Sequence, residues 1–140
     1  MVLKKSGMAI VIILLFVFEA KANEYDLFNI IVLDGDTLRA TISLGYDTYI
    51  KKDVRCLYYD AWEISKHRRT VEVTDEEIIK GKVAQVELEK LIKSADRVYI
   101  EPGKPLFDSY GRVLGKLMIK KNNELINVSV FMKENHHVRE

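Results

Sequence analysis

The sequence predicts a small, mainly β domain that carries one long helix, an α+β class. Three observations predict it. Short runs rich in Ile, Val, Leu and Thr recur between turn signals along residues 24–58. A helical pattern of apolar residues follows at 75–94, and two more strand-like runs come after it. A chain of 140 residues with 48% hydrophobic composition suits one such domain.

Residues 1–22 have the pattern of an export signal. Lys4 and Lys5 precede an apolar run over residues 8–18, and Ala20-Lys21-Ala22 is a small-x-small cleavage pattern. The run is shorter than the roughly 20 apolar residues that a spanning helix needs. We expect a secretory signal peptide cut after Ala22, an exported protein in the periplasm or medium, and no permanent membrane span. The alternatives are an uncleaved membrane anchor and, third, a buried helix.

The first half of the mature chain reads as three strands. Residues 24–33, 37–44 and 48–58 are strand-like, and they are separated by the turn signals Asp34-Gly35-Asp36 and 45–47. Such short connections predict an antiparallel meander. Glycine accepts positive φ and Asp34 can cap its own turn, so the turn accounts for Asp34 and Gly35 but not for Asp36.

The second half adds the helix and two strands. Thr74 with Glu77 three residues later is a capping-box signature, and apolar residues then recur at spacings of three and four. Residues 97–102 and 113–120 read as strands. Residues 125–132 fit a short helix or another strand, and we favour the helix. Five strands with one helix between the third and fourth predict a barrel of the oligonucleotide/oligosaccharide-binding (OB) type over residues 23–133, followed by a flexible tail at 134–140.

The charge balance argues against non-specific coating of nucleic acid. Residues 1–22 hold three of the 22 basic and one of the 21 acidic residues, so cleavage leaves a formal charge near −1. Any affinity for a polyanion must therefore come from local placement of Arg and Lys. Cys56 is the single cysteine, so no internal disulfide forms, and its apolar neighbours favour a buried strand position over a reactive thiol.

Three clusters could carry chemistry: "DGDT" at residues 34–37, "VRCLYYDAWE" at 54–63 and "DSYGR" at 108–112. Hydrolysis of a phosphodiester needs an activated water and relief of the charge that builds on the phosphoryl oxygens. A carboxylate pair for a hard cation, a further carboxylate as base and two arginines supply these needs. In this order and on this strand pattern, the clusters resemble the staphylococcal nuclease-like (thermonuclease) family of calcium-dependent phosphodiesterases on OB-fold barrels.

The resemblance implies a calcium site. Its ligands are the carboxylates of Asp36 and Asp60 and the main-chain carbonyl of Ala61, and Asp34 supports the site from beside it. Ca²⁺ takes six to eight oxygens, so water and the substrate phosphate complete a loose site. Taken without the other clusters, both Asp36 and Asp60 would read as turn formers.

The resemblance also assigns Arg55, Arg112 and Glu63. Arg55 donates paired hydrogen bonds to the scissile phosphate, Arg112 stabilises the transition state, and Glu63 is the general base. From the residues alone, Arg55 inside an apolar strand is costly unless it meets an anion, although alternate strand positions also point outward. Tyr110 is placed to flank the nucleotide, and a Tyr-Gly-Arg turn by itself is more often structural.

The sequence departs from the family in three places. Trp62 stands where the family has proline, and either stacks on a base or packs against the barrel. Ser109 replaces a lysine, and the family's downstream tyrosines and final helix have no counterpart.

Three further groups of residues carry little functional weight. The basic stretch from Lys66 to Arg69 fits a solvated loop better than a phosphate-tracking patch, and the adjacent His136 and His137 read as incidental. The triplet Asn127-Val128-Ser129 fits a glycosylation sequon.

The sequence thus predicts a monomeric, exported, calcium-dependent endonuclease. It would hydrolyse DNA, RNA or both with little sequence preference. The alternative is a non-catalytic OB-fold module of the cell envelope that binds nucleic acid or a protein partner. Trp62, the missing tyrosines and the near-zero charge motivate this alternative.

Overall fold

The computed structural model describes residues 23–66 and 72–139. The predicted signal peptide at 1–22 and the basic residues His67, Arg68 and Arg69 lie outside them. The elements in chain order are β1 (Tyr25–Asp34), β2 (Thr37–Gly45), β3 (Thr48–Cys56), α1 (Asp75–Lys93), β4 (Arg97–Phe107), β5 (Val113–Lys121), β6 (Glu124–Asn127) and α2 (Val128–Glu134). No helix in the described part of the chain is long and apolar enough to cross a membrane.

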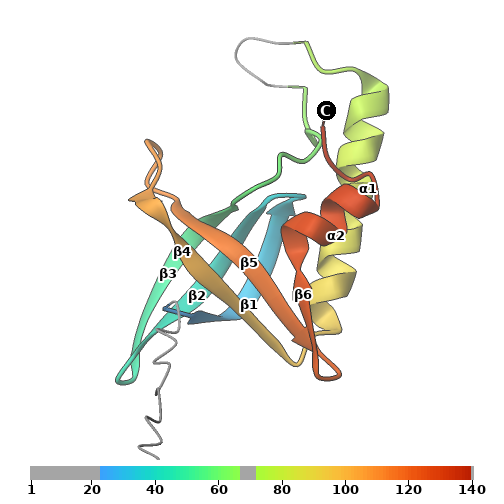
Figure 1. The fold of residues 1–140 in the computed structure, drawn as a ribbon. Coiled ribbons are helices and arrows are strands. Elements are labelled where there is room, and N and C mark those ends of the chain that lie inside the picture. Colours follow the sequence, from blue (N-terminus) through green and yellow to red (C-terminus); the bar gives the residue numbers. More distant parts are fainter. Residues whose placement is uncertain (1–22, 67–71, 140) are drawn as a thin grey trace, which may run out of the picture.

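Five strands close into a barrel (Figure 1). β1, β2 and β3 form the predicted antiparallel meander, β4 pairs with β1, and β5 pairs with β4. The parallel pairing of β3 with β5 at residues 113–115 closes the ring, and β6 pairs with the later part of β5, at residues 118–121. The structure therefore confirms a mainly β domain with α, built on an OB-fold-like barrel.

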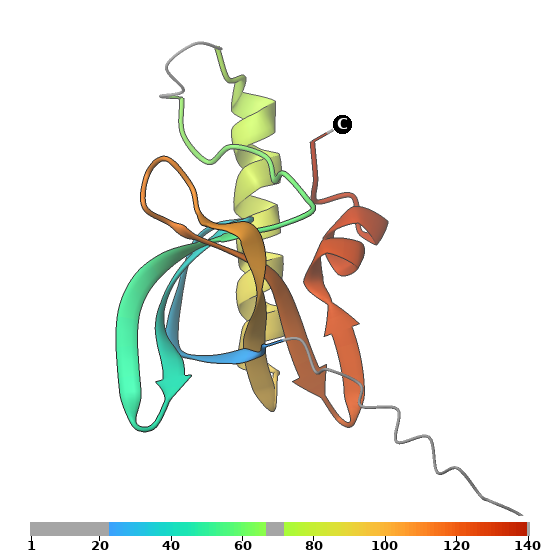
Figure 2. The same cartoon turned by 60° about the vertical axis from the view of Figure 1, so that its left-hand side comes forward.

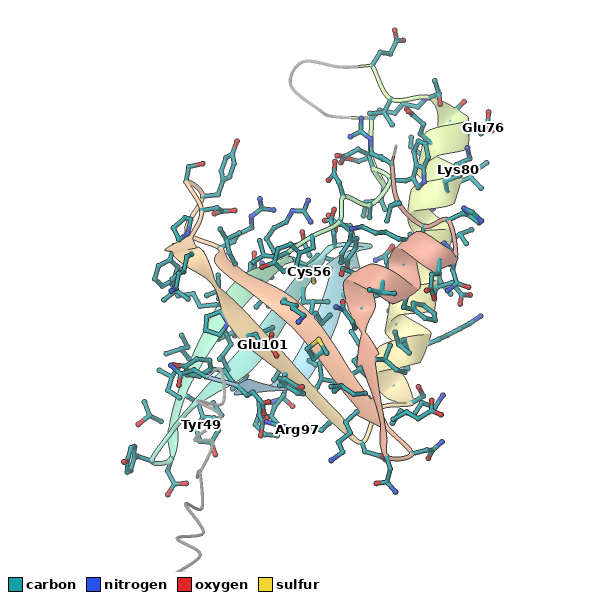
Figure 3. The ribbon with its side chains drawn as sticks, viewed as in Figure 1. Tyr49, Cys56, Glu76, Lys80, Arg97 and Glu101 are labelled. Carbon is teal, nitrogen blue, oxygen red and sulfur yellow. The ribbon has the colours of Figure 1, made fainter. Side chains whose placement is uncertain are left out.

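Alternation of apolar residues along the strands fills the barrel. Leu38, Ala40 and Ile42 of β2 are buried, as are Val54 and Cys56 of β3. Residues that face outward between them, such as Arg39 and Lys51, are exposed. This period of two is what the strand-like runs predict. Figure 3 shows Cys56 and Tyr49 toward opposite ends of β3, the first in the core and the second at the hairpin end.

Both helices lie to the right of the barrel in Figure 1, and in Figure 2 α1 stands behind the strands with α2 at the right-hand edge. α1 begins at the predicted capping box: the Thr74 hydroxyl accepts the Glu77 N–H, and the Glu77 carboxylate accepts the Thr74 N–H. Ala84, Leu88 and Leu91 of α1 are buried in the common core, together with Val128 and Met132 of α2. The long helix between β3 and β4 and the short C-terminal helix are thus both confirmed.

Several boundaries differ from the prediction. β3 ends at Cys56 because Tyr58 has a positive φ of 73°, and β4 continues to Phe107, through residues predicted to be loop. Residues 125–132 are part strand and part helix. The switch comes at Asn127, whose side chain caps α2 by accepting the N–H groups of Ser129 and Val130.

The segment after α2 is not the free tail that the sequence suggested. Val138 forms a bridge with Ala61, and the Arg139 N–H donates to the Asp60 carbonyl at 2.8 Å. The His137 N–H donates to the Met132 carbonyl at 2.9 Å. In Figures 1 and 2 the C-terminus lies beside the loop that follows β3. Main-chain pairing with that loop, which the sequence pattern does not encode, holds this segment in place.

Candidate active site

One pocket gathers nearly all the residues singled out from the sequence. It has a volume of about 310 Å³ and is named here the site pocket. Its lining residues are Asp34, Asp36, Thr37, Arg55, Asp60, Ala61, Trp62, Glu63 and Arg112. They come from the β1–β2 turn, the end of β3 with the loop that follows it, and the residue before β5. Four of the lining residues are carboxylates and two are arginines.

Strand pairing explains why three distant segments meet. The β2–β3 register sets Thr37 opposite Arg55. The parallel register of β3 with β5 aligns Val54 with Val113, which brings Arg112 to the same barrel end. The Cys56 N–H also donates to the Asp36 carbonyl at 2.8 Å, so the turn is tied directly to the end of β3.

The β1–β2 turn is built as predicted at Asp34 and differently at Gly35. The Asp34 carboxylate accepts the Asp36 N–H at 3.0 Å and so caps the turn. Gly35 does not have a positive φ, contrary to the expectation. It is needed for close packing, because a Cβ there would lie 2.6 Å from the Ala61 Cβ and 3.0 Å from the Ala84 Cβ. Glycine therefore lets α1 and the loop from Asp60 to Glu63, named here the site loop, approach the turn.

Asp36 is the most buried carboxylate of the pocket, with 7% of its surface exposed. Its Oδ2 accepts the Ala61 N–H at 2.8 Å and lies 2.9 Å from Arg55 Nη1, while Oδ1 accepts the Thr37 hydroxyl at 3.1 Å. Burial, and next the Asp34 carboxyl group, raise the pKa of Asp36 from 3.8 to about 7 against the opposing effects of Arg55 and the Ala61 N–H. A negative charge at Asp36 is therefore costly even beside Arg55, and a further cation would stabilise it.

Arg55 joins the two carboxylates predicted to bind calcium. Its Nη1 lies 2.9 Å from Asp36 Oδ2, and its Nη2 lies 2.9 Å from Asp60 Oδ1. Nη1 also contacts the Cys56 carbonyl at 3.2 Å. Arg55 does occupy an outward-facing strand position, but the loop after β3 covers it and leaves only 20% of its side chain exposed. The Arg55 side chain thus lies on the outer face of β3 and also lines the site pocket.

The core beneath the pocket holds Cys56 and Tyr59. Burial raises the pKa of the Cys56 thiol to about 12, and the residue is 1% exposed. This confirms a buried structural cysteine rather than a reactive thiol. The Tyr59 hydroxyl donates to the Gly35 carbonyl at 2.8 Å and fixes the floor of the turn.

The loop from Asp60 to Glu63 rests on α1. A Cβ at Gly81 of α1 would collide with the main-chain carbonyls of Trp62 and Glu63, so only glycine leaves room for the loop. The Trp62 ring contacts α1, because the Lys80 ammonium lies 4.6 Å from the centre of the ring. Figure 3 labels Lys80 on α1. The indole N–H is buried without a hydrogen-bond partner in the described residues. Of the two roles predicted for Trp62, these contacts match packing.

Arg139 is a site residue that the sequence reasoning missed. Its Nη1 lies 3.7 Å from Glu63 Oε1 and 3.9 Å from Asp60 Oδ2. The main-chain pairing of Val138 and Arg139 with Ala61 and Asp60 holds it there. No local pattern marks this residue, because its partners lie more than 70 positions earlier in the chain.

Arg112 is held by Asp108, a second residue that the sequence reasoning left without a role. Arg112 Nε lies 2.6 Å from Asp108 Oδ2, and Asp108 Oδ1 accepts the N–H groups of Tyr110 and Arg112, each at 2.9 Å. Burial acts to raise the pKa of Asp108, but the hydrogen bonds from Arg112 and Tyr110 outweigh it and lower the pKa. The four-residue spacing within "DSYGR" was the signal for this pair.

Tyr110 is the one predicted site residue that the structure does not place on the site pocket. It lies in the β4–β5 loop with 82% of its surface exposed, and the Arg112 guanidinium carbon is 5.5 Å from the centre of its ring. His136 and His137 line a separate hollow beside Trp62 and α1. In the described part of the chain, no group of three or more His, Cys, Asp or Glu side chains is arranged to hold a metal ion.

The donor chemistry of the site pocket nevertheless suits a hard cation. The lining holds four carboxylates and two arginines, so its formal charge is negative. Burial also destabilises the charged form of Asp36, which a hard cation would stabilise. No protein-family model matches this chain, and a search of curated proteins found no match.

Proposed function

We propose that the chain is an exported, calcium-dependent nuclease of the staphylococcal nuclease-like kind, hydrolysing DNA, RNA or both with little sequence preference. The observation that carries the proposal is the single pocket lined by Asp36, Arg55, Asp60, Glu63 and Arg112. These five positions matched the family motifs although they are spread over 77 positions of sequence. If these five residues were only turn formers or surface residues, the fold would not need to bring them together in one pocket.

Calcium would be held by the Asp36 and Asp60 carboxylates and the Ala61 carbonyl, with Asp34 adding negative charge. When bound, it supplies charge neutralisation for the phosphoryl oxygens. Once the ion takes its place between Asp36 and Asp60, the Arg55 guanidinium would turn to the substrate phosphate and bind it together with Arg112. Glu63 accepts the proton of the attacking water, whose oxygen bonds to phosphorus while the bond to the leaving oxygen breaks.

The test uses residues 23–140 with single-stranded DNA, plasmid DNA and RNA, in Ca²⁺ and in chelator. We expect cleavage in Ca²⁺ alone. We also expect Arg55→Ala and Glu63→Ala each to lower kcat by about 100-fold or more. Lys93→Gln, on the exposed surface of α1, is the matched control and should cleave normally. Absence of cleavage in Ca²⁺, or full activity of either site variant, would refute the proposal.

A non-catalytic OB-fold binding module is the second candidate. The observation in its favour is the position of Arg55, whose guanidinium lies between Asp36 and Asp60 and pairs with both. A guanidinium in this place satisfies both carboxylates without a metal ion. Oligonucleotide binding that persists in chelator, weakens with salt and yields no products in Ca²⁺ would select this candidate.

A further inference from the structure

A second hollow, named here the basic groove, adjoins the site pocket and shares Arg112 with it. Its volume is about 380 Å³, and its other lining residues include Arg39, Lys51, Lys52, Asp53 and Tyr110. Four of its lining residues are cations and one is a carboxylate. The charge of the lining is therefore opposite to that of the site pocket next to it.

Two of the four cations have no anionic partner in the described part of the chain. Arg39 pairs with Asp53 at 2.8 Å, and Arg112 pairs with Asp108 at 2.6 Å. Lys51 and Lys52 are exposed and make no ion pair with any described residue. Their ammonium groups are the ones available to an external anion.

Strand β3 contributes residues to both the site pocket and the basic groove. Arg55 and Lys51, four residues apart, lie on the outer face of β3, whereas Lys52, set opposite the buried Ala40, lines the groove from the other face of the strand. Cross-strand register sets Arg39 opposite Asp53, between Arg55 and Lys51. Four residues of strand span about 13 Å. A phosphate held by Arg55 and one held by Lys51 therefore belong to different nucleotides.

Tyr110 gives the basic groove an aromatic rim. Its side chain is 82% exposed and has no burial role in the barrel core. An exposed ring beside these cations provides a surface on which an unpaired base can stack. A base that is paired and stacked within a duplex cannot reach this ring. The charge of the groove attracts any polyanion, and the exposed aromatic ring is the feature that favours a single strand over a duplex.

We propose that the basic groove binds a single-stranded nucleic acid along its backbone, so that Lys51 and Lys52 hold phosphates on one side of the bond in the site pocket. This inference rests on the proposed function for the position of the scissile bond. It makes a twelve-nucleotide strand a better ligand than a dinucleotide, which cannot reach both hollows.

The test measures binding of fluorescein-labelled dT12 and dT2 by anisotropy in chelator, where no cleavage occurs. The variants are Lys51→Gln/Lys52→Gln and the control Lys93→Gln/Lys120→Gln, which removes two exposed lysines elsewhere. We expect the groove variant to weaken dT12 binding about fivefold or more at low salt and to lower the slope of log K against log salt by about 1.4. The control should bind like the parent protein.

Three outcomes would overturn the groove. They are equal binding of dT12 and dT2 by the parent protein, equal dT12 binding by the groove variant and its control, and a twelve-base-pair duplex that binds as tightly as dT12. Cleavage is assayed separately in Ca²⁺. Its complete absence counts against the proposed nuclease, whereas the length dependence of binding in chelator decides the groove by itself.

Discussion

Asp36 shows how one residue is defined by its surroundings. In the sequence it is the second carboxylate of a turn, and in the structure it is 7% exposed and contacts Arg55, Thr37 and the Ala61 N–H. Its burial raises its pKa to about 7, so near neutral pH the Asp36 carboxyl group is only partly ionised and burial destabilises its negative charge. A bound cation would stabilise this negative charge, which links Asp36 to the proposed calcium site.

Replacement of Asp36 should change how stability depends on pH. The unfolded chain loses the Asp36 proton near pH 4, while the folded chain keeps it to about 7. The stabilising contribution of the protonated group is therefore full below pH 4 and is lost as pH rises through 7, by at most about 4 kcal/mol. In chelator, the free energy of unfolding of the parent protein should fall across this range relative to that of Asp36→Asn. Urea unfolding at several pH values measures this, and a constant difference would contradict it.

At the scale of elements, α1 and the C-terminal segment together position the site loop. Gly81 lets the main chain of Trp62 and Glu63 lie on the helix. On the other side of the loop, Val138 and Arg139 pair with Ala61 and Asp60. Trp62 does not restrict the loop backbone as a proline would, and these two elements support the loop from outside it.

Gly81→Ala should destabilise the protein although it raises helix propensity. On an exposed helix the change stabilises by about 1 kcal/mol. Here the added Cβ meets main-chain carbonyls that cannot rotate away, so we expect a net loss of about 1–3 kcal/mol. Thermal unfolding measures it, and Lys82→Ala on the exposed side of α1 is the control. A stabilised Gly81→Ala protein would show that the loop does not rest on the helix.

Arg139→Ala should tighten calcium binding. Its guanidinium lies within 4 Å of carboxylate oxygens of both Asp60 and Glu63, so its charge opposes a cation in the pocket. At about 6 Å in water, loss of that charge favours a divalent ion by about 1.4 kcal/mol, which is up to about tenfold in Kd. Isothermal titration calorimetry measures the change. Arg139→Lys keeps the charge and should keep the affinity; equal tightening in both variants would assign the effect to packing instead.

At the scale of the whole molecule, barrel closure assembles the site. The β3–β5 pairing is parallel and joins strands separated by α1 and β4, and it brings Arg112 to the end of β3. The pocket therefore exists only in the folded barrel. A ligand of the pocket binds the native state and stabilises the entire domain.

Calcium should raise the free energy of unfolding of the mature chain by about 2.7 kcal/mol at 100 times its Kd. Asp60→Asn should remove most of this gain, and Asp53→Asn, a carboxylate outside the site pocket, should retain it. Thermal unfolding with Ca²⁺ and with chelator measures the effect. Equal stabilisation of the two variants would place the ion elsewhere.

Local patterns determined the elements of this protein. Period-two alternation and turn residues gave the meander, and Thr74 with Glu77 marked the start of α1, because caps and turns are formed by neighbours in sequence. The motif clusters also pointed to the residues of the site pocket, apart from Tyr110. The predicted element boundaries were wrong at two places, where Tyr58 ends β3 and where Asn127 turns a strand into a helix.

Only the tertiary structure decided the remaining features. The close packing at Gly35 and Gly81, the Arg55 guanidinium between two carboxylates, and the return of Arg139 to the site loop all depend on contacts between distant segments. The basic groove depends on the same parallel pairing that closes the barrel. A sequence specifies such contacts through the packing of the whole core, and no window of neighbouring residues contains them.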